Sequence, residues 1–80
     1  MNRSSFILYS RGNCPLCDKA KLILEEIREE SGLTYEEIDI YSDDELIEKY
    51  ALMIPVLELN GQLIQYGNID KSMVYAHFQK

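Results

Sequence analysis

The alternation of hydrophobic and polar residues along the chain predicts strands and helices in turn. An apolar run at residues 6–9 is typical of a short buried strand. Between residues 15 and 30, apolar side chains recur every three or four positions, which predicts an amphipathic helix. Pro15 suits the first turn of this helix, and Ser31-Gly32 is a typical end. We therefore expect a strand followed at once by a helix whose apolar stripe contains Leu16, Ala20, Ile23, Leu24 and Ile27.

A second strand and a short helix are predicted in the middle of the chain. Residues 33–40 alternate weakly and contain β-branched and aromatic side chains, which favours a strand. Ser42 and Glu45 stand in the capping-box relation, so a short helix that contains Leu46, Ile47 and Tyr50 is expected to begin there. Because the links are short, a right-handed crossover should leave the first two strands parallel.

The last third of the chain predicts a hairpin and a final helix. Strand-like runs at residues 56–59 and 62–65 are separated by Asn60-Gly61, and both turn residues can take a positive φ in a type I′ turn. Gly67-Asn68 ends the second run, and Asn68 is expected to cap the last helix. The order β-α-β-α-β-β-α predicts an α/β fold with a four-stranded mixed sheet and helices on both faces, in one domain of residues 1–80.

Composition and charge restrict the possible functions. A chain of 80 residues is long enough for one core. The net charge is −6, and the eight Lys and Arg are scattered, so neither nucleic acid nor an anionic membrane is an expected partner. With no signal-like or membrane-spanning run, we expect a cytoplasmic monomer. The polar face of the first helix is interpreted as a solvated surface; it carries Asp18, Glu25, Glu26, Glu29 and Glu30.

Both cysteines lie in Cys14-Pro15-Leu16-Cys17, at the predicted turn from strand to helix. At the helix N-cap, the sulfur of Cys14 would accept hydrogen bonds from free N–H groups at the positive end of the helix dipole. Such a position lowers a cysteine pKa from about 8.5 to about 3.5–7.5, and Arg11 would add positive charge. Cys17 follows about one helical turn later. We therefore predict that Cys14 is the nucleophile and Cys17 the resolving cysteine of thiol–disulfide exchange.

Two other roles for the cysteine pair stay open at this stage. The same cysteines could bind a metal or a dimer-bridging iron–sulfur cluster, or they could be purely structural. A structural zinc site normally needs four ligands, and the nearest further candidate by residue type is His77 in the last predicted helix. In a reducing compartment, a Cys-x-x-Cys pair favours the redox role. We expect no metal ligands and no bound cofactor.

Three motifs resemble those of glutaredoxins. Tyr9-Ser10-Arg11-x-x-Cys14-Pro15-Leu16-Cys17 is similar to the pattern Tyr-Ser-Lys-x-x-Cys-Pro-Tyr-Cys. Ile54-Pro55 is similar to the hydrophobic residue and cis-proline of the thioredoxin superfamily, and Gly67-x-x-Asp70 is similar to half of the segment Gly-Gly-x-x-Asp. Over essentially its whole length, the chain resembles a glutaredoxin-like protein of the thioredoxin superfamily. The resemblance implies a thioredoxin-like fold and a thiol–disulfide oxidoreductase.

The resemblance also implies a substrate-binding site around the cysteines. Pro55 would be cis and pack against the cysteines, and the backbone of Ile54 would pair with an extended substrate. Arg11 would pair with a carboxylate of the substrate, and Asp70 would meet an amine at a helix start. Glutathione is then a possible co-substrate. The substrate-binding residues expected on this basis are Arg11, Pro15, Leu16, Ile54, Pro55, Gly67 and Asp70.

The sequence departs from the glutaredoxin pattern at three positions. Tyr66 replaces the first glycine of the Gly-Gly pair, Leu52 stands where many glutaredoxins have a basic residue, and Leu16 replaces the motif tyrosine. The substrate is therefore expected to be a disulfide-containing protein or a small thiol, and the negative surface favours a protein. The expected electron donor is a reductase of the glutathione or the thioredoxin type.

Overall fold

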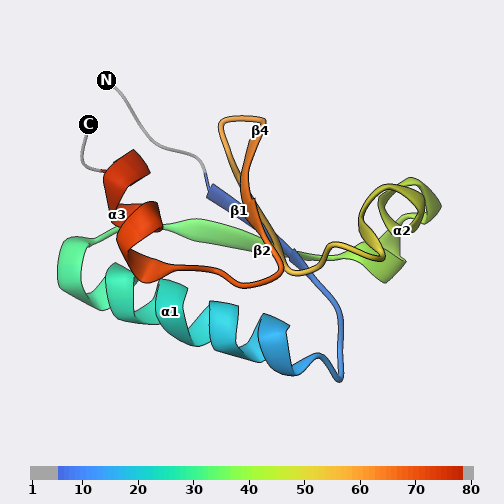
Figure 1. Cartoon of the computed structure of the whole chain (residues 1–80), viewed down its shortest axis with the longest axis horizontal. Coiled ribbons are helices and arrows are strands. Elements are labelled where there is room, and N and C mark those ends of the chain that lie inside the picture. Colours follow the sequence, from blue (N-terminus) through green and yellow to red (C-terminus); the bar gives the residue numbers. More distant parts are fainter. Residues whose placement is uncertain (1–5, 79–80) are drawn as a thin grey trace.

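The computed structural model describes residues 6–78 and contains the predicted elements in the predicted order (Figure 1). One short 3₁₀ helix, η1, is added between the second strand and the second helix. It begins where the sequence pattern had extended the strand, so the prediction for residues 33–40 was too long. The elements are β1 (Phe6–Ser10), α1 (Pro15–Ser31), β2 (Tyr35–Asp39), η1 (Ile40–Ser42), α2 (Asp44–Tyr50), β3 (Val56–Leu59), β4 (Gln62–Tyr66) and α3 (Lys71–Phe78).

The four strands form one mixed sheet in the order β2-β1-β3-β4. Strands β1 and β2 are parallel, as the crossover through α1 requires, whereas β3 pairs antiparallel with both β1 and β4. The β3–β4 turn has φ angles of 52° at Asn60 and 85° at Gly61. The predicted hairpin and the predicted mixed sheet are therefore both confirmed.

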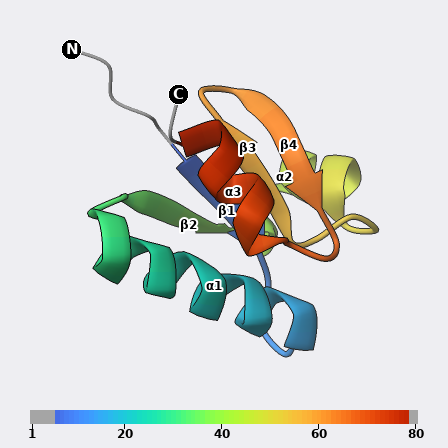
Figure 2. The ribbon, with the colours of Figure 1, turned by 60° about the vertical axis from the view of Figure 1, so that its left-hand side comes forward.

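Helices cover both faces of the sheet, which confirms the predicted α/β layers. Figure 2 shows α3 in front of the sheet and α2 behind it, and α1 packs into the same core cluster as α3. The side chains of each strand alternate between the two faces, so the core falls into two clusters. The smaller cluster, on the α2 side, contains Ile40, Tyr50 and Val56. The larger cluster, beneath α1 and α3, contains Phe6, Leu8, Ala20, Leu24, Ile27, Leu33, Leu57, Ile69 and Val74.

Helix α1 has the predicted ends, and its buried face differs from the predicted stripe only in the first turn. It ends at Gly32, which has a φ of 82° and donates its N–H to the carbonyl oxygen of Arg28. Leu16 was expected in the apolar stripe, yet 46% of its surface is exposed. Cys17 takes the first buried position instead, and a step of one residue turns a side chain by about 100° around the helix. The residues of α1 that are buried are Cys17, Ala20, Leu24 and Ile27.

The predicted cap of α2 was wrong by one residue. The N-cap is Asp43, whose carboxylate accepts a hydrogen bond of 2.9 Å from the N–H of Glu45. Ser42 belongs to η1, and its hydroxyl donates instead to the carbonyl oxygen of Asp39. The unexpected 3₁₀ turn takes up Ser42 and moves the start of the helix along the chain.

The predicted cap of α3 was wrong by two residues. Asp70, and not Asn68, caps this helix by accepting hydrogen bonds of 2.9 Å from the N–H and the hydroxyl of Ser72. Ile69 is 6% exposed and belongs to the core. Because this buried side chain fixes the chain just before Asp70, the helix begins at Lys71.

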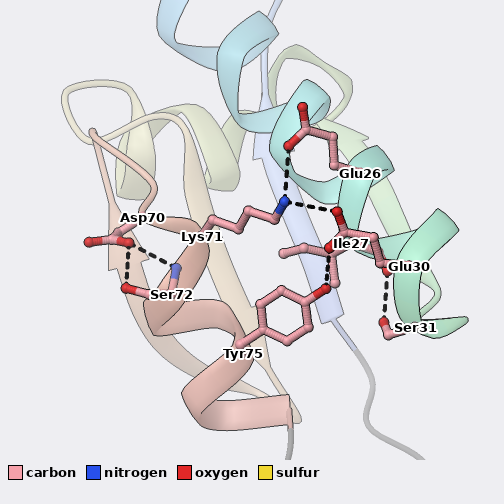
Figure 3. Close-up of polar contacts among 8 residues, drawn as sticks. All are labelled: Glu26, Ile27, Glu30, Ser31, Asp70, Lys71, Ser72 and Tyr75. Atoms are coloured by element: carbon pink, nitrogen blue, oxygen red, sulfur yellow. Dashed lines mark hydrogen bonds and ion pairs between the residues drawn. The ribbon is translucent and has the colours of Figure 1, made fainter.

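Part of the acidic face of α1 binds α3 and is not simply solvated (Figure 3). The ammonium group of Lys71 lies 3.3 Å from the carboxylate of Glu26 and 3.1 Å from that of Glu30. The hydroxyl of Tyr75 donates a 2.5 Å hydrogen bond to Glu30. These contacts, with the Tyr75 hydrogen bond first, lower the pKa of the Glu30 carboxyl.

A second polar contact lies inside the opposite layer. Glu58 on β3 is 9% exposed, and its carboxylate accepts hydrogen bonds from the hydroxyls of Tyr50 and Tyr9. The two tyrosine rings are 4.9 Å apart between centroids. Burial, followed by the contacts with Glu58, raises the pKa of both tyrosines. A buried carboxylate is costly without partners, so Tyr50 compensates for the burial of Glu58.

We predict that Tyr50→Phe destabilises the protein because it removes the main hydrogen-bond donor to a buried carboxylate. The expected loss in the free energy of unfolding is about 1–3 kcal/mol, measured by urea denaturation. Tyr41→Phe is the matched control, since Tyr41 is 61% exposed. Equal stability of the two variants would contradict the structural role of the Tyr50–Glu58 contact.

We also predict an acid-sensitive contribution from Glu30. Its pKa in the folded protein lies below the ordinary value of 4.5, so its stabilising effect is complete above that value and is lost as the pH falls. Urea midpoints measured from about pH 7 to about pH 3 should fall less steeply for Glu30→Gln than for the wild type. Glu29→Gln on the same helix is the control, and the same flattening in both variants would refute the assignment.

Candidate redox site

The strand register brings three loops to one edge of the sheet. Tyr9 near the end of β1 pairs with Val56 at the start of β3, so the loop after β1 and the loop before β3 emerge together. Val56 also pairs with Tyr66 at the end of β4. The N–H of Gly67 then donates to the carbonyl oxygens of Met53 at 3.1 Å and of Pro55 at 2.8 Å. The loops that contain Cys14, Pro55 and Gly67 therefore meet at the same edge.

Cys14 is the N-cap of α1, as the sequence predicts. Its backbone is extended, with a φ of −130°, and its carbonyl oxygen accepts the N–H of Asp18 at 3.0 Å. The sulfur of Cys14 accepts the N–H of Cys17 at 3.1 Å. This backbone donor and the positive end of the helix dipole both favour negative charge on the Cys14 sulfur when the pair is reduced.

The two cysteines form a disulfide with a Cα–Cα distance of 5.1 Å. Cys14 is 6% exposed, whereas Cys17 is fully buried in the first turn of α1. Cys14 is therefore the less completely buried of the two cysteines, and Cys17 is bonded to it from within the helix. This difference matches the roles that a nucleophile and a resolving cysteine require.

The approach to Cys14 is an exposed turn. Asn13 has a φ of 51°, a left-handed conformation that asparagine tolerates, and it turns the chain from β1 into the helix. Arg11 is exposed, and its guanidinium donates to the carbonyl oxygen of Gly12 at 3.3 Å. Pro15 occupies the first position of the helix, also exposed. Leu16 follows it on the surface, beside the cysteine pair.

The loop before β3 is tied to the end of α2. The peptide bond between Ile54 and Pro55 is cis, and the proline ring is fully buried. The N–H groups of Met53 and Ile54 both donate to the carbonyl oxygen of Tyr50, at 2.8 Å and 3.1 Å. The N–H of Ile54 is therefore already used within the protein, which differs from the full backbone pairing with substrate that the resemblance implies.

Asp70 also makes its hydrogen bonds within the chain. Its N–H donates to the side-chain oxygen of Gln65 at 2.7 Å, and its carboxylate accepts from Ser72. The hydrogen bonds from Ser72 lower the pKa of the Asp70 carboxyl. Gly67, with a φ of 76°, starts the turn that leads to Asp70. The carboxylate expected to meet a substrate amine thus serves first as the cap of α3.

Two residues beside the site were noted in the sequence only as departures from a pattern. Leu52 in the loop before β3 is fully exposed, and Tyr66 at the end of β4 is 57% exposed. Both flank the Gly67–Met53 hydrogen bond. The available signal was a large side chain, leucine or tyrosine, where the glutaredoxin pattern has a basic residue or a glycine.

Residues 6–78 contain neither a cluster of metal-ligating side chains nor a membrane-spanning helix. Within residues 6–78, no group of three or more His, Cys, Asp and Glu side chains is placed to hold a metal ion. The ring of His77 lies on α3, with its Nδ1 3.0 Å from the carbonyl oxygen of Met73. Among the helices formed by the same residues, none is long and apolar enough to cross a membrane.

Solved structures with the same fold come from several organisms. The solution NMR structure of protein Ne2328 from Nitrosomonas europaea has a TM-score of 0.81 and 22% identity, covering 96% of this chain and 93% of that one. The X-ray structure of protein XcR50 from X. campestris has a TM-score of 0.77 and 28% identity, covering 92% and 95%. Oxidised thioredoxin from Plasmodium falciparum has a TM-score of 0.65 and 16% identity, covering 98% and 80%. The fold is therefore thioredoxin-like.

The sequence also matches a protein-family model over nearly its whole length. The model is described as Glutaredoxin-like domain (DUF836), and it matches residues 5–79. The match includes both cysteines, Pro55 and every element of the sheet. Together with the thioredoxin-like fold and the paired cysteines at the start of α1, it shows that the chain belongs to this glutaredoxin-like family.

Proposed function

We propose that the protein is a dithiol thiol–disulfide oxidoreductase that reduces protein or glutathione mixed disulfides. The observation that carries the proposal is the position of Cys14, whose sulfur caps α1, accepts the N–H of Cys17 and is bonded to the sulfur of Cys17. Membership of a glutaredoxin-like family and the thioredoxin-like fold support the same chemistry. The reaction needs no bound cofactor, because the two sulfurs carry both electrons.

The reaction consists of two exchange steps. The Cys14 thiolate attacks one sulfur of the substrate disulfide, so that a Cys14–substrate bond forms, the substrate S–S bond breaks and the first thiolate leaves and takes up a proton. Cys17 then loses its proton and attacks Cys14, which forms the intramolecular disulfide and releases the second substrate thiol. The substrate gains two electrons and two protons, and the cysteine pair is oxidised. An external thiol or a reductase returns the two electrons.

We predict that the two cysteine substitutions differ in effect. Cys14→Ser should abolish reduction of a disulfide substrate, since it removes the assigned nucleophile. Cys17→Ser should leave the first step intact and accumulate a Cys14–substrate mixed disulfide. The measurement is insulin reduction with dithiothreitol, together with intact mass after incubation with a disulfide peptide.

Maleimide labelling gives a direct control, because the chain has only two cysteines. The wild type should gain two labels when reduced and none when oxidised. Both variants should unfold at similar temperatures under reducing conditions. Equal, undiminished activity of the two variants, or a mixed disulfide on Cys17 in Cys14→Ser, would contradict the assigned roles.

A further inference from the structure

We propose that the site takes disulfides whose cysteines are flanked by apolar side chains in a protein segment, and that it disfavours glutathione. The proposal rests on the proposed thiol–disulfide exchange at Cys14 and specifies its substrate class. Two independent observations support it. Large apolar side chains are exposed around the cysteine pair, and the polar groups that would hold a charged tripeptide are engaged within the chain.

The apolar side chains lie in or next to the three loops that meet at the site, in the first turn of α1, in the loop before β3 and at the end of β4. Leu16 is 46% exposed, Leu52 is 100% exposed and Tyr66 is 57% exposed. The register of Val56 with both Tyr9 and Tyr66 places these loops together. Figures 1 and 2 both show the chain after β4 at the same end of the sheet as the first turn of α1.

Apolar side chains exposed at this edge of the sheet favour a partner that removes them from water. A single exposed leucine is ordinary on a protein surface, but three large apolar side chains at the loops that meet at one edge of the sheet form an interaction surface. An extended segment with Leu, Ile, Val or Phe beside its cysteine would remove these side chains from water while its disulfide reaches Cys14. Glutathione has only a cysteine between two polar residues and would cover little of this surface.

The backbone donors at the site are already occupied. The N–H of Ile54 donates to Tyr50, and the N–H of Asp70 donates to Gln65. At the start of α3, the N–H of Ser72 is bound by the Asp70 carboxylate, so an incoming carboxylate would have to displace a negative charge. An anionic ligand would therefore break existing hydrogen bonds, whereas an apolar contact would break none of them.

The charges favour the same class of partner. Next to the cysteine pair in the sequence, the cations Arg11 and Lys19 are accompanied by the anion Asp18, and all three residues are exposed. The whole chain has a net charge of −6, which repels anionic glutathione and attracts a basic partner. The occupant that combines both requirements is a protein segment with apolar residues beside the cysteine and lysine or arginine beyond them.

A single-turnover experiment tests this specificity without a reductase. Reduced protein is mixed with an excess of one disulfide, and its oxidation is followed by maleimide quenching. The disulfides are bis(2-hydroxyethyl) disulfide as a small neutral reference, oxidised glutathione, and the symmetrical disulfide of the peptide Lys-Leu-Cys-Leu-Lys. We expect the peptide disulfide to react at least about tenfold faster than oxidised glutathione, which corresponds to a modest difference in contact energy.

Leu52→Ser identifies the surface responsible. We expect this variant to lower the ratio of the peptide rate to the reference rate by about threefold to tenfold, because the leucine side chain no longer contacts the peptide. The matched control is Leu22→Ser, since Leu22 is 65% exposed on α1 and lies outside the three loops. This control should keep the wild-type ratio.

The possible outcomes separate the two proposals. If oxidised glutathione reacts as fast as the peptide, or if Leu52→Ser and Leu22→Ser change the ratio equally, the substrate class is wrong while disulfide exchange stands. If reduced protein is not oxidised by any of the three disulfides, the proposed function fails and the substrate class fails with it. A fast peptide reaction that depends on Leu52 and not on Leu22 supports the proposal.

Discussion

The antiparallel pairing of β1 with β3 is the constraint on which the site depends. Tyr9 opposite Val56 places the end of one central strand beside the start of the other. The loop that leads to Cys14 and the loop that contains Pro55 must then leave the sheet at the same edge. Because Val56 also pairs with Tyr66, the third loop joins them. A shift of one residue in this register would turn the side chains of β3 to the opposite faces and separate the loops.

The helices are held to this sheet and to one another by contacts between tyrosines and glutamates as well as by apolar packing. Tyr35 on β2 donates to Glu25 on α1, and desolvation, followed by this contact, raises the pKa of Tyr35 to about 12. Tyr75 on α3 donates to Glu30 on α1, and Tyr50 on α2 to the buried Glu58. Three of the glutamates in this acidic chain thus accept hydrogen bonds that join one element to another.

The periodicity of apolar residues was sufficient to predict the strands and helices and their order, because apolar residues recur at different intervals in strands and in helices. It failed where two neighbouring residues compete for one role, as with Ser42 against Asp43 and Leu16 against Cys17. Hydrogen-bonding ability and apolar character are similar within each pair, and only the packed chain decides between them. The bond from the Ile54 N–H to the end of α2 was equally beyond the sequence, since it depends on how two elements meet.

The site therefore combines a reactive cysteine made by one short segment with side chains that distant segments supply. The chemistry of Cys14 depends on local structure, because a helix N-terminus and a cysteine three residues later are contained in one short segment. The proposed recognition rests on Leu52 and Tyr66, which lie far along the chain and come to the same edge of the sheet as the cysteine loop only through the strand register. A match to a family model predicts the cysteine pair at the helix N-terminus well, because this arrangement needs only a few residues. The same match does not predict which substrate is recognised, because exposed loop residues can change without disturbing the disulfide or the fold.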